Sequence, residues 1–190
     1  MQDTFTVRKA VMKDISHILR LINAYAAQGI MLSRTEVELS ENIRDFSVIE
    51  SEDGLVGCAA LHFYSPTTGE IRSLAVSPLY QGRGAGVLLV QELENEAQFF
   101  NLHNLFAFTY IPRFFAKFGY REIERSRLPL KVWKDCLRCP KFENCDEIAV
   151  LKEIGIHYNV GIKNPAYEKC SSESHSVDLP HQLPRALPSH

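Results

Sequence analysis

The sequence predicts an α+β domain in which helices flank a central, mixed but mostly antiparallel, twisted sheet. Three observations support this prediction: two helical segments follow the first strand, two neighbouring strands are joined by a tight turn, and a helix crosses between later strands. With 190 residues and 45% hydrophobic content, the chain is long enough for one buried core. We expect one domain over residues 1–167, with its core at 4–150, and a disordered tail at 168–190.

The N-terminal part predicts a first strand at residues 4–7, followed by two helices. Asp14 is a suitable N-cap for a helix that ends at Gly29 and carries apolar side chains on one face. Thr35 and Glu38 have the spacing of a capping box, which predicts a second, shorter helix. The residues expected on the apolar face of the first helix are Ile15, Ile18, Leu19, Ile22 and Tyr25.

The middle of the chain predicts three strands, at residues 46–50, 55–64 and 70–76. The first two are joined around Asp53-Gly54, a pair that tolerates positive φ and favours a hairpin. The third strand runs into Ser77-Pro78, which ends it.

The later part predicts a helix that begins near Val87, a strand at 105–109, a short helix at 113–117 stopped by Gly119, and a strand at 120–124. Together with the antiparallel middle, this order completes a sheet with helical crossings. The residues expected at core spacing in the first of these helices are Val90, Leu93, Ala97 and Phe100.

Composition excludes several classes of function. With 21 basic and 23 acidic side chains the formal charge is -2, so no global basic field attracts nucleic acid. The apolar runs are too short to cross a bilayer, and the first residues lack a charged-then-apolar leader, so we expect a cytoplasmic protein without nucleic-acid or membrane partners. The oligomeric state stays open, with a homodimer as one option.

The most informative segment lies between the strand at 70–76 and the following helix, and it contains three glycines within six residues. Glycine lets the backbone approach a ligand closely, and a helix N-terminus favours anions. The segment does not match a Walker loop or a dinucleotide fingerprint. We therefore expect these amides to hold a pyrophosphate. The segment reads Gln81, Gly82, Arg83, Gly84, Ala85 and Gly86.

At this point the chain resembles the GCN5-related N-acetyltransferases (GNAT), over approximately residues 4–150. The resemblance rests on the glycine-rich loop behind a Leu-Ala-Val-Ser-Pro strand and on the segment 114–120. It implies the GNAT fold and acetyl-coenzyme A as cosubstrate. The residues that it assigns to the cosubstrate are Leu74, Ala75, Val76, the loop 81–86 and Phe115.

The resemblance also implies how the chemistry is done. Many members have a Tyr at the position of Phe115, where it is proposed to protonate the departing thiolate. Phe115 has no proton to give, so another group acts as acid or the thiolate leaves unaided. Glu70 is the candidate base, and the backbone N–H of Leu74 or Val76 is the candidate donor to the thioester carbonyl. An ordinary solvated carboxylate at a strand end remains the alternative for Glu70.

A narrower resemblance concerns the acceptor. The segments 21–29, 31–35, 43–46 and 128–136, the last with the following 139–142, are similar to the stand-alone acetyltransferase form of N-acetylglutamate synthase. This implies an amino-acid N-acetyltransferase that acts on L-glutamate in the first step of arginine biosynthesis. A dicarboxylate calls for cationic partners, and the candidates are Arg34, Arg72 and Lys131, each of which could equally be a surface charge.

The five cysteines indicate a reducing compartment more than a disulfide scaffold. Cys136, Cys139 and Cys145 have some character of a metal site, but a fourth ligand is not evident, so we expect reduced cysteines and no metal.

Two alternative functions remain open. One is acetylation of another small amine or of a protein N-terminus, and the other is a non-catalytic sensor of acetyl-coenzyme A.

Overall fold

The computed structural model describes residues 4–128, 136–137 and 139–155, all of which belong to one compact unit. The sequence-based predictions for the tail at 168–190, for the domain end at 167 and for Lys131 lie outside the described residues. The described residues contain no helix that is both long and apolar enough to pass through a bilayer.

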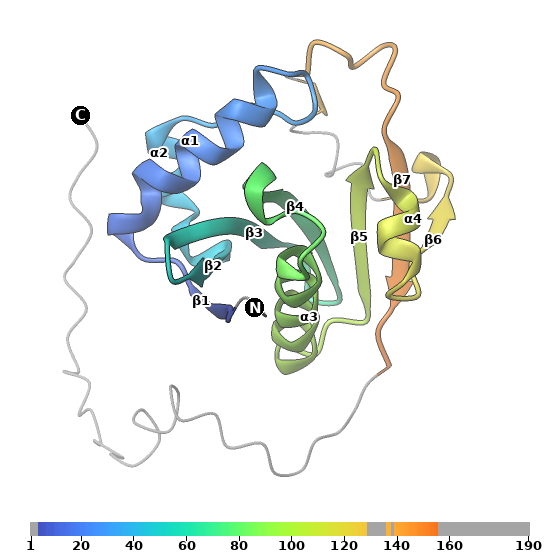
Figure 1. Cartoon of the computed structure of the whole chain (residues 1–190). Coiled ribbons are helices and arrows are strands. Elements are labelled where there is room, and N and C mark those ends of the chain that lie inside the picture. Colours follow the sequence, from blue (N-terminus) through green and yellow to red (C-terminus); the bar gives the residue numbers. More distant parts are fainter. Residues whose placement is uncertain (1–3, 129–135, 138, 156–190) are drawn as a thin grey trace, which may run out of the picture. The chain divides into compact units, whose positions relative to one another are not determined.

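Seven strands form one sheet in the order β1-β2-β3-β4-β5-β7-β6 (Figure 1). Every neighbouring pair is antiparallel except β4 and β5, which run parallel. The predicted α+β fold with a mixed, mostly antiparallel sheet is therefore confirmed. The strands are β1 (Thr6–Lys9), β2 (Phe46–Ser51), β3 (Gly54–Ser65), β4 (Thr68–Val76), β5 (Asn104–Thr109), β6 (Arg121–Ile123) and β7 (Ile148–Glu153).

Helices α1 (Ile15–Ala26) and α2 (Glu36–Glu41) pack on one face of the sheet. Helix α3 (Ala85–Phe99) packs on the other face, across β1 to β4. Strand alternation explains this division, since Val48 and Ile49 are neighbours on β2 but belong to opposite cores. Helix α4 (Pro112–Ala116) lies against β6 and β7.

The two early helices begin as their sequences predict, with one difference. At α2, Thr35 accepts a hydrogen bond from the backbone N–H of Glu38, and Glu38 bonds back to the N–H of Thr35, which confirms the capping box. At α1, Asp14 occupies the N-cap position, but its carboxylate instead accepts bonds from Arg8 and from the N–H of Val11.

One prediction about the elements was wrong, and one element was missed. Phe100 was expected in the core, but α3 ends at Phe99 and the chain turns at once through Asn101, which has φ of 56°, so Phe100 is 41% exposed. The strand β7, inserted between β5 and β6, was not predicted. The described part of the 154–162 segment, which the sequence left unassigned, is Ile154 and Gly155, and it follows this strand.

Candidate active site

The parallel strands β4 and β5 separate along their length, and this fork is the centre of the site (Figure 1). Their pairing extends only from Thr68 opposite Asn104 to Glu70 opposite Phe106. Beyond Glu70, β4 continues for six residues to Val76 without a registered partner on β5 in the described structure. The far end of β4 therefore presents a backbone edge that is not used by the neighbouring strand.

On its other side, the same stretch of β4 carries a bulge. Cys58 pairs with Ala75 while Ala60 pairs with Arg72, so β4 has one residue more than β3 between these pairs. The extra length lies at Ser73 and Leu74, and Ser73 adopts φ of 54°. Since neither residue has a registered partner on β3 or β5 in the described structure, the backbone at Leu74 is the part of the fork least committed to the sheet.

The glycine-rich loop lies directly after this edge and leads into α3. Gly82 and Gly84 have φ of 74° and 97°, which glycine adopts at little cost. A Cβ added to either would meet nothing within 4 Å, so the loop backbone faces open space. The N–H of Leu88 donates to the carbonyl of Gly84 at 3.1 Å, and the leading N–H groups of α3 lie just before it. This arrangement can hold an anion such as a pyrophosphate.

Tyr25 ties the loop to the end of β4. Its hydroxyl donates to the carbonyl of Val76 and accepts a hydrogen bond from Nε2 of Gln81 at 2.7 Å. Burial raises the pKa of Tyr25, while the bond from Gln81 acts in the opposite direction. The sequence predicted Tyr25 only as a core residue, so its part in fixing the loop was missed.

Phe115 is buried beneath the fork, on α4. Its side chain is 3% exposed and packs edge-on against Tyr120, with ring centroids 5.3 Å apart. Its neighbour Phe114 lies 3.5 Å from the position of a Cβ on Gly86, so α4 contacts the start of α3. The position at which many family members have an acid is thus a packing residue in this chain.

A cavity of about 790 Å³ opens on the face of the sheet opposite α3. Glu70 lies in its wall, 8% exposed, and accepts a hydrogen bond from the hydroxyl of Tyr64 at 3.0 Å. Leu74 and Phe115 also line the cavity, so it reaches the fork. Of the residues predicted for the site, Glu70, Arg34, Arg72, Leu74 and Phe115 border this one space.

Arg34 enters the cavity from the segment between α1 and α2. Asn23 holds its backbone at both ends: the N–H of Arg34 donates to Oδ1 of Asn23 at 2.9 Å, and Nδ2 of Asn23 donates to the Arg34 carbonyl at 3.0 Å. This pair of hydrogen bonds fixes the segment to α1 and explains why Arg34 faces the site although it lies in a loop.

Arg72 also lines the cavity but is committed to a partner. Its Nη2 lies 3.7 Å from Oδ2 of Asp45, and the same carboxylate oxygen lies 2.7 Å from Nδ1 of His62. Its side chain is 12% exposed. Arg72 therefore contributes positive charge to the cavity wall, but Asp45 compensates part of that charge.

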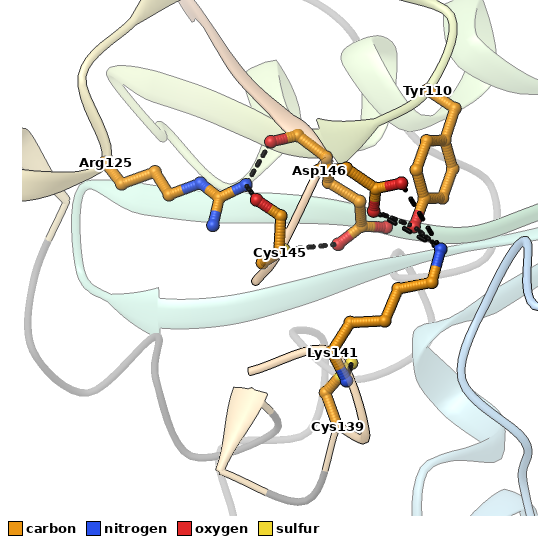
Figure 2. Close-up of polar contacts among 7 residues, drawn as sticks. Tyr110, Arg125, Cys139, Lys141, Cys145 and Asp146 are labelled. Atoms are coloured by element: carbon orange, nitrogen blue, oxygen red, sulfur yellow. Dashed lines mark hydrogen bonds and ion pairs between the residues drawn. The ribbon is translucent and has the colours of Figure 1, made fainter. Parts of the chain in front are cut away.

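Tyr110, just after β5, joins the wall to the segment before β7 (Figure 2). Its hydroxyl donates to Oδ1 of Asp146 at 2.8 Å and accepts from Nζ of Lys141 at 3.0 Å. Lys141 also pairs with Asp146 at 3.3 Å. Burial raises the pKa of Tyr110, so the phenol stays protonated at neutral pH.

Arg125 fixes the same segment from the other side. Its Nη2 donates to the carbonyl of Cys145 at 3.1 Å and to that of Glu147 (Figure 2). Its guanidinium also lies 5.9 Å from the centre of the Phe108 ring. Burial raises the pKa of Glu147, against the attraction of Arg125.

The three clustered cysteines belong to this wall as free thiols. Burial, followed by the nearby Cys145 and Glu70, raises the pKa of Cys136 to about 11. Among the described residues, no three His, Cys, Asp or Glu side chains converge on a point where a metal ion would sit. The expectation that the cysteines are reduced and bind no metal stays a prediction.

Sequence analysis missed several residues that shape the cavity. Tyr64 could have been noted because it lies two residues after His62 on a predicted strand and therefore shares its face. Tyr110 could have been noted because it directly follows the strand predicted at 105–109. Lys141 lies in a segment that carries the narrower resemblance, but neither Lys141 nor Arg125 was assigned a role, because no structure was predicted between the strand at 120–124 and residue 154.

Comparison with known proteins agrees with this architecture. Residues 15–120 match the acetyltransferase (GNAT) family. An uncharacterized N-acetyltransferase of Chlorobaculum tepidum is 41% identical over 148 residues, which cover 78% of this chain and 96% of the relative. An amino-acid acetyltransferase of Mycobacterium tuberculosis is 36% identical over 135 residues, covering 70% of this chain and 77% of the relative.

Among solved structures, N-acetylglutamate synthase from Neisseria gonorrhoeae, complexed with coenzyme A and N-acetyl-glutamate, superposes with a TM-score of 0.73 at 31% identity. The match covers 80% of this chain but only 35% of that protein. The extent of the family match and the identity to relatives of similar length lead to one conclusion: this chain belongs to the acetyltransferase (GNAT) family.

Proposed function

We propose that the protein transfers an acetyl group from acetyl-coenzyme A to the amine of L-glutamate, as the first step of arginine biosynthesis in the cytoplasm. The observation that carries the proposal is that one cavity is lined by a buried carboxylate, Glu70, by an anchored cation, Arg34, and by the open edge of β4. The Mycobacterium tuberculosis relative is an amino-acid acetyltransferase, which supports the same class of acceptor.

The described residues fit coenzyme A on the α3 side. The loop 81–86 supplies a backbone in open space at a helix N-terminus, which suits a pyrophosphate. Leu74, Ala75 and Val76 supply the strand edge for the extended arm of the cosubstrate, and Phe115 supplies an apolar floor. The N–H of Leu74 or Val76 is our candidate for polarising the thioester carbonyl.

On the opposite face, Glu70 accepts a proton from the incoming ammonium, directly or through water, and releases it to solvent. The neutral amine then attacks the thioester carbon, the bond from carbon to sulfur breaks, and coenzyme A leaves as a thiolate. The nitrogen gives its second proton to Glu70 or to water as the amide forms. With Phe115 unable to donate, the thiolate departs unaided or takes its proton from another group; a thiol pKa of about 8.5 makes unaided departure tolerable near neutral pH.

The glutamate carboxylates are assigned to the cations of the cavity. Arg34 is the first choice, because its backbone is anchored by Asn23. Arg72 is a weaker choice, because Asp45 already attracts it. Lys131 remains a candidate from sequence alone. Lys141 lines the cavity and adds positive charge that the sequence did not predict.

The test is thiol release from acetyl-coenzyme A across a panel of amino acids. We expect glutamate to give the highest kcat/KM. Release with other amines but not with glutamate would favour a different acceptor, and binding of acetyl-coenzyme A without turnover would favour a sensor.

A further inference from the structure

We infer that Tyr64 is a positioning residue for Glu70. The Tyr64 hydroxyl holds the Glu70 carboxylate in its ionised form and in a fixed orientation. The inference rests on the proposed function, in which Glu70 is the base. It concerns a contact that neither the family resemblance nor the sequence pattern assigned.

Strand register brings the two residues together. His62 on β3 is the Cα partner of Glu70 on β4, and Tyr64 lies two residues further along β3, on the same face. A register shift occurs between Phe63 and Ser65, next to Tyr64. The result is a hydrogen bond of 3.0 Å from the Tyr64 hydroxyl to Oε2 of Glu70.

Packing fixes the Tyr64 ring on both sides. The His62 ring meets it edge-on, with centroids 5.0 Å apart, and the Phe106 ring lies at 5.5 Å. His62 is itself fixed by Asp45 at 2.7 Å, and Phe106 is fully buried. The hydroxyl is therefore held in place before any substrate binds.

A buried base needs such a donor. Glu70 is only 8% exposed, and removal from water favours the neutral carboxyl, which cannot accept a proton. A hydroxyl that donates to the carboxylate favours the charged form and lowers its pKa. Without this bond, a larger share of Glu70 would be protonated near neutral pH and the base would be lost.

Other titratable groups share the site, but they would be common to wild type and variant. Within the described residues they are His62 on β3, Arg72 on β4, Asp45 before β2, Arg34 and Glu38 from the α1–α2 segment, Tyr110 after β5, and Arg125, Cys136, Cys139, Lys141, Cys145 and Glu147 from the later wall.

The experiment is the pH dependence of kcat/KM for glutamate with Tyr64→Phe. The acidic limb is the part of the profile in which kcat/KM falls as Glu70 becomes protonated. Loss of the bond should move this limb upward by about one pH unit, so kcat/KM falls about tenfold at pH values below the limb and recovers at higher pH. Tyr80→Phe is the matched control, because its hydroxyl bonds Asp53 and the residue does not line the cavity, so we expect its limb to stay in place. An unmoved limb in Tyr64→Phe would overturn the inference.

A third variant separates this failure from failure of the proposed function. If Glu70→Gln keeps the wild-type limb, Glu70 is not the base and the proposed mechanism falls. If Glu70→Gln removes the limb while Tyr64→Phe leaves it unchanged, only the role of Tyr64 is lost. Should Tyr64→Phe fold poorly, 3-fluorotyrosine at position 64 keeps the ring and makes the hydroxyl a stronger donor. The limb should then move downward, and a limb that stays in place would overturn the inference equally.

Discussion

Nε2 of Gln81 lies 2.7 Å from the hydroxyl oxygen of Tyr25, so the glycine-rich loop is tied directly to the first helix. The same hydroxyl donates to the carbonyl of Val76, the last residue of β4. One phenol thus sets the spacing between the strand edge and the loop, the two parts proposed to hold the cosubstrate.

Tyr25→Phe is expected to loosen this loop. The ring stays in place, but both hydrogen bonds are lost, at about 0.5–1.5 kcal/mol each. We expect the KM for acetyl-coenzyme A to rise roughly 3–10-fold, with a smaller change in the KM for glutamate. Steady-state kinetics with each substrate varied in turn would check this. A rise in the glutamate KM alone would contradict the assigned role.

Arg34→Ala should weaken glutamate binding and leave acetyl-coenzyme A binding intact. Loss of a charge-assisted bond costs about 1.5–3 kcal/mol, which corresponds to a rise in the glutamate KM of roughly 10–150-fold. Arg20→Ala is the matched control, because Arg20 is an exposed arginine of α1 that does not line the cavity. If the two variants behave alike, Arg34 is not part of the acceptor site.

Gly57→Ala is expected to destabilise the sheet next to the bulge. An added Cβ would lie 2.8 Å from Cγ2 of Ile49 and 3.0 Å from the Ala75 carbonyl oxygen. Such overpacking costs about 1–3 kcal/mol. Urea unfolding would measure the loss, with Gly155→Ala as a control, because its Cβ meets nothing within 4 Å. Equal stability of the two variants would contradict the close packing at Gly57.

Asp14→Asn should lower stability in a pH-dependent way. Two bonds from Arg8, at 2.7 and 3.0 Å, are the main cause of a lowered pKa for Asp14. A lowered folded-state pKa stabilises the protein above the unfolded pKa of about 3.9, and this contribution is lost as pH falls through the folded value. We expect a loss of about 1.5–3 kcal/mol at pH 7 that shrinks below about pH 4.

Urea unfolding of Asp14→Asn at both pH values checks this prediction. Glu50→Gln is the comparison, since Glu50 binds the same Arg8 but its side chain is 36% exposed, so we expect less than about 1 kcal/mol. A loss for Asp14→Asn that is constant with pH would contradict the prediction.

Local signals in the sequence were sufficient for most elements. The capping box at Thr35 and the turn at Gly54 depend on neighbouring residues, and both formed as predicted. Strand β7 could not be predicted because its place between β5 and β6 depends on pairing with distant segments. The helical pattern of α3 likewise extended through Phe100, and only the turn at Asn101 ends it.

The site was predictable where a motif fixes the backbone and not where register fixes a side chain. The glycine-rich loop was found from composition and position, and its positive φ angles fit the motif, while its ligand stays a proposal. The bond from Tyr64 to Glu70 depends on the β3–β4 register and a bulge, and the charge of Lys141 enters through a segment whose path the sequence does not specify.

The fork between β4 and β5 has an evolutionary consequence. The loop at the start of α3 and the Arg34 segment belong to different faces of the sheet, and they are connected through the edge of β4 and through helix α1. Under the proposed function, mutations in the wall around Arg34 would alter which amine is chosen, with little effect on the loop that is proposed to hold the cosubstrate. If the loop 81–86 stays constant while the wall around Arg34 diverges, one fold can come to serve new acceptors.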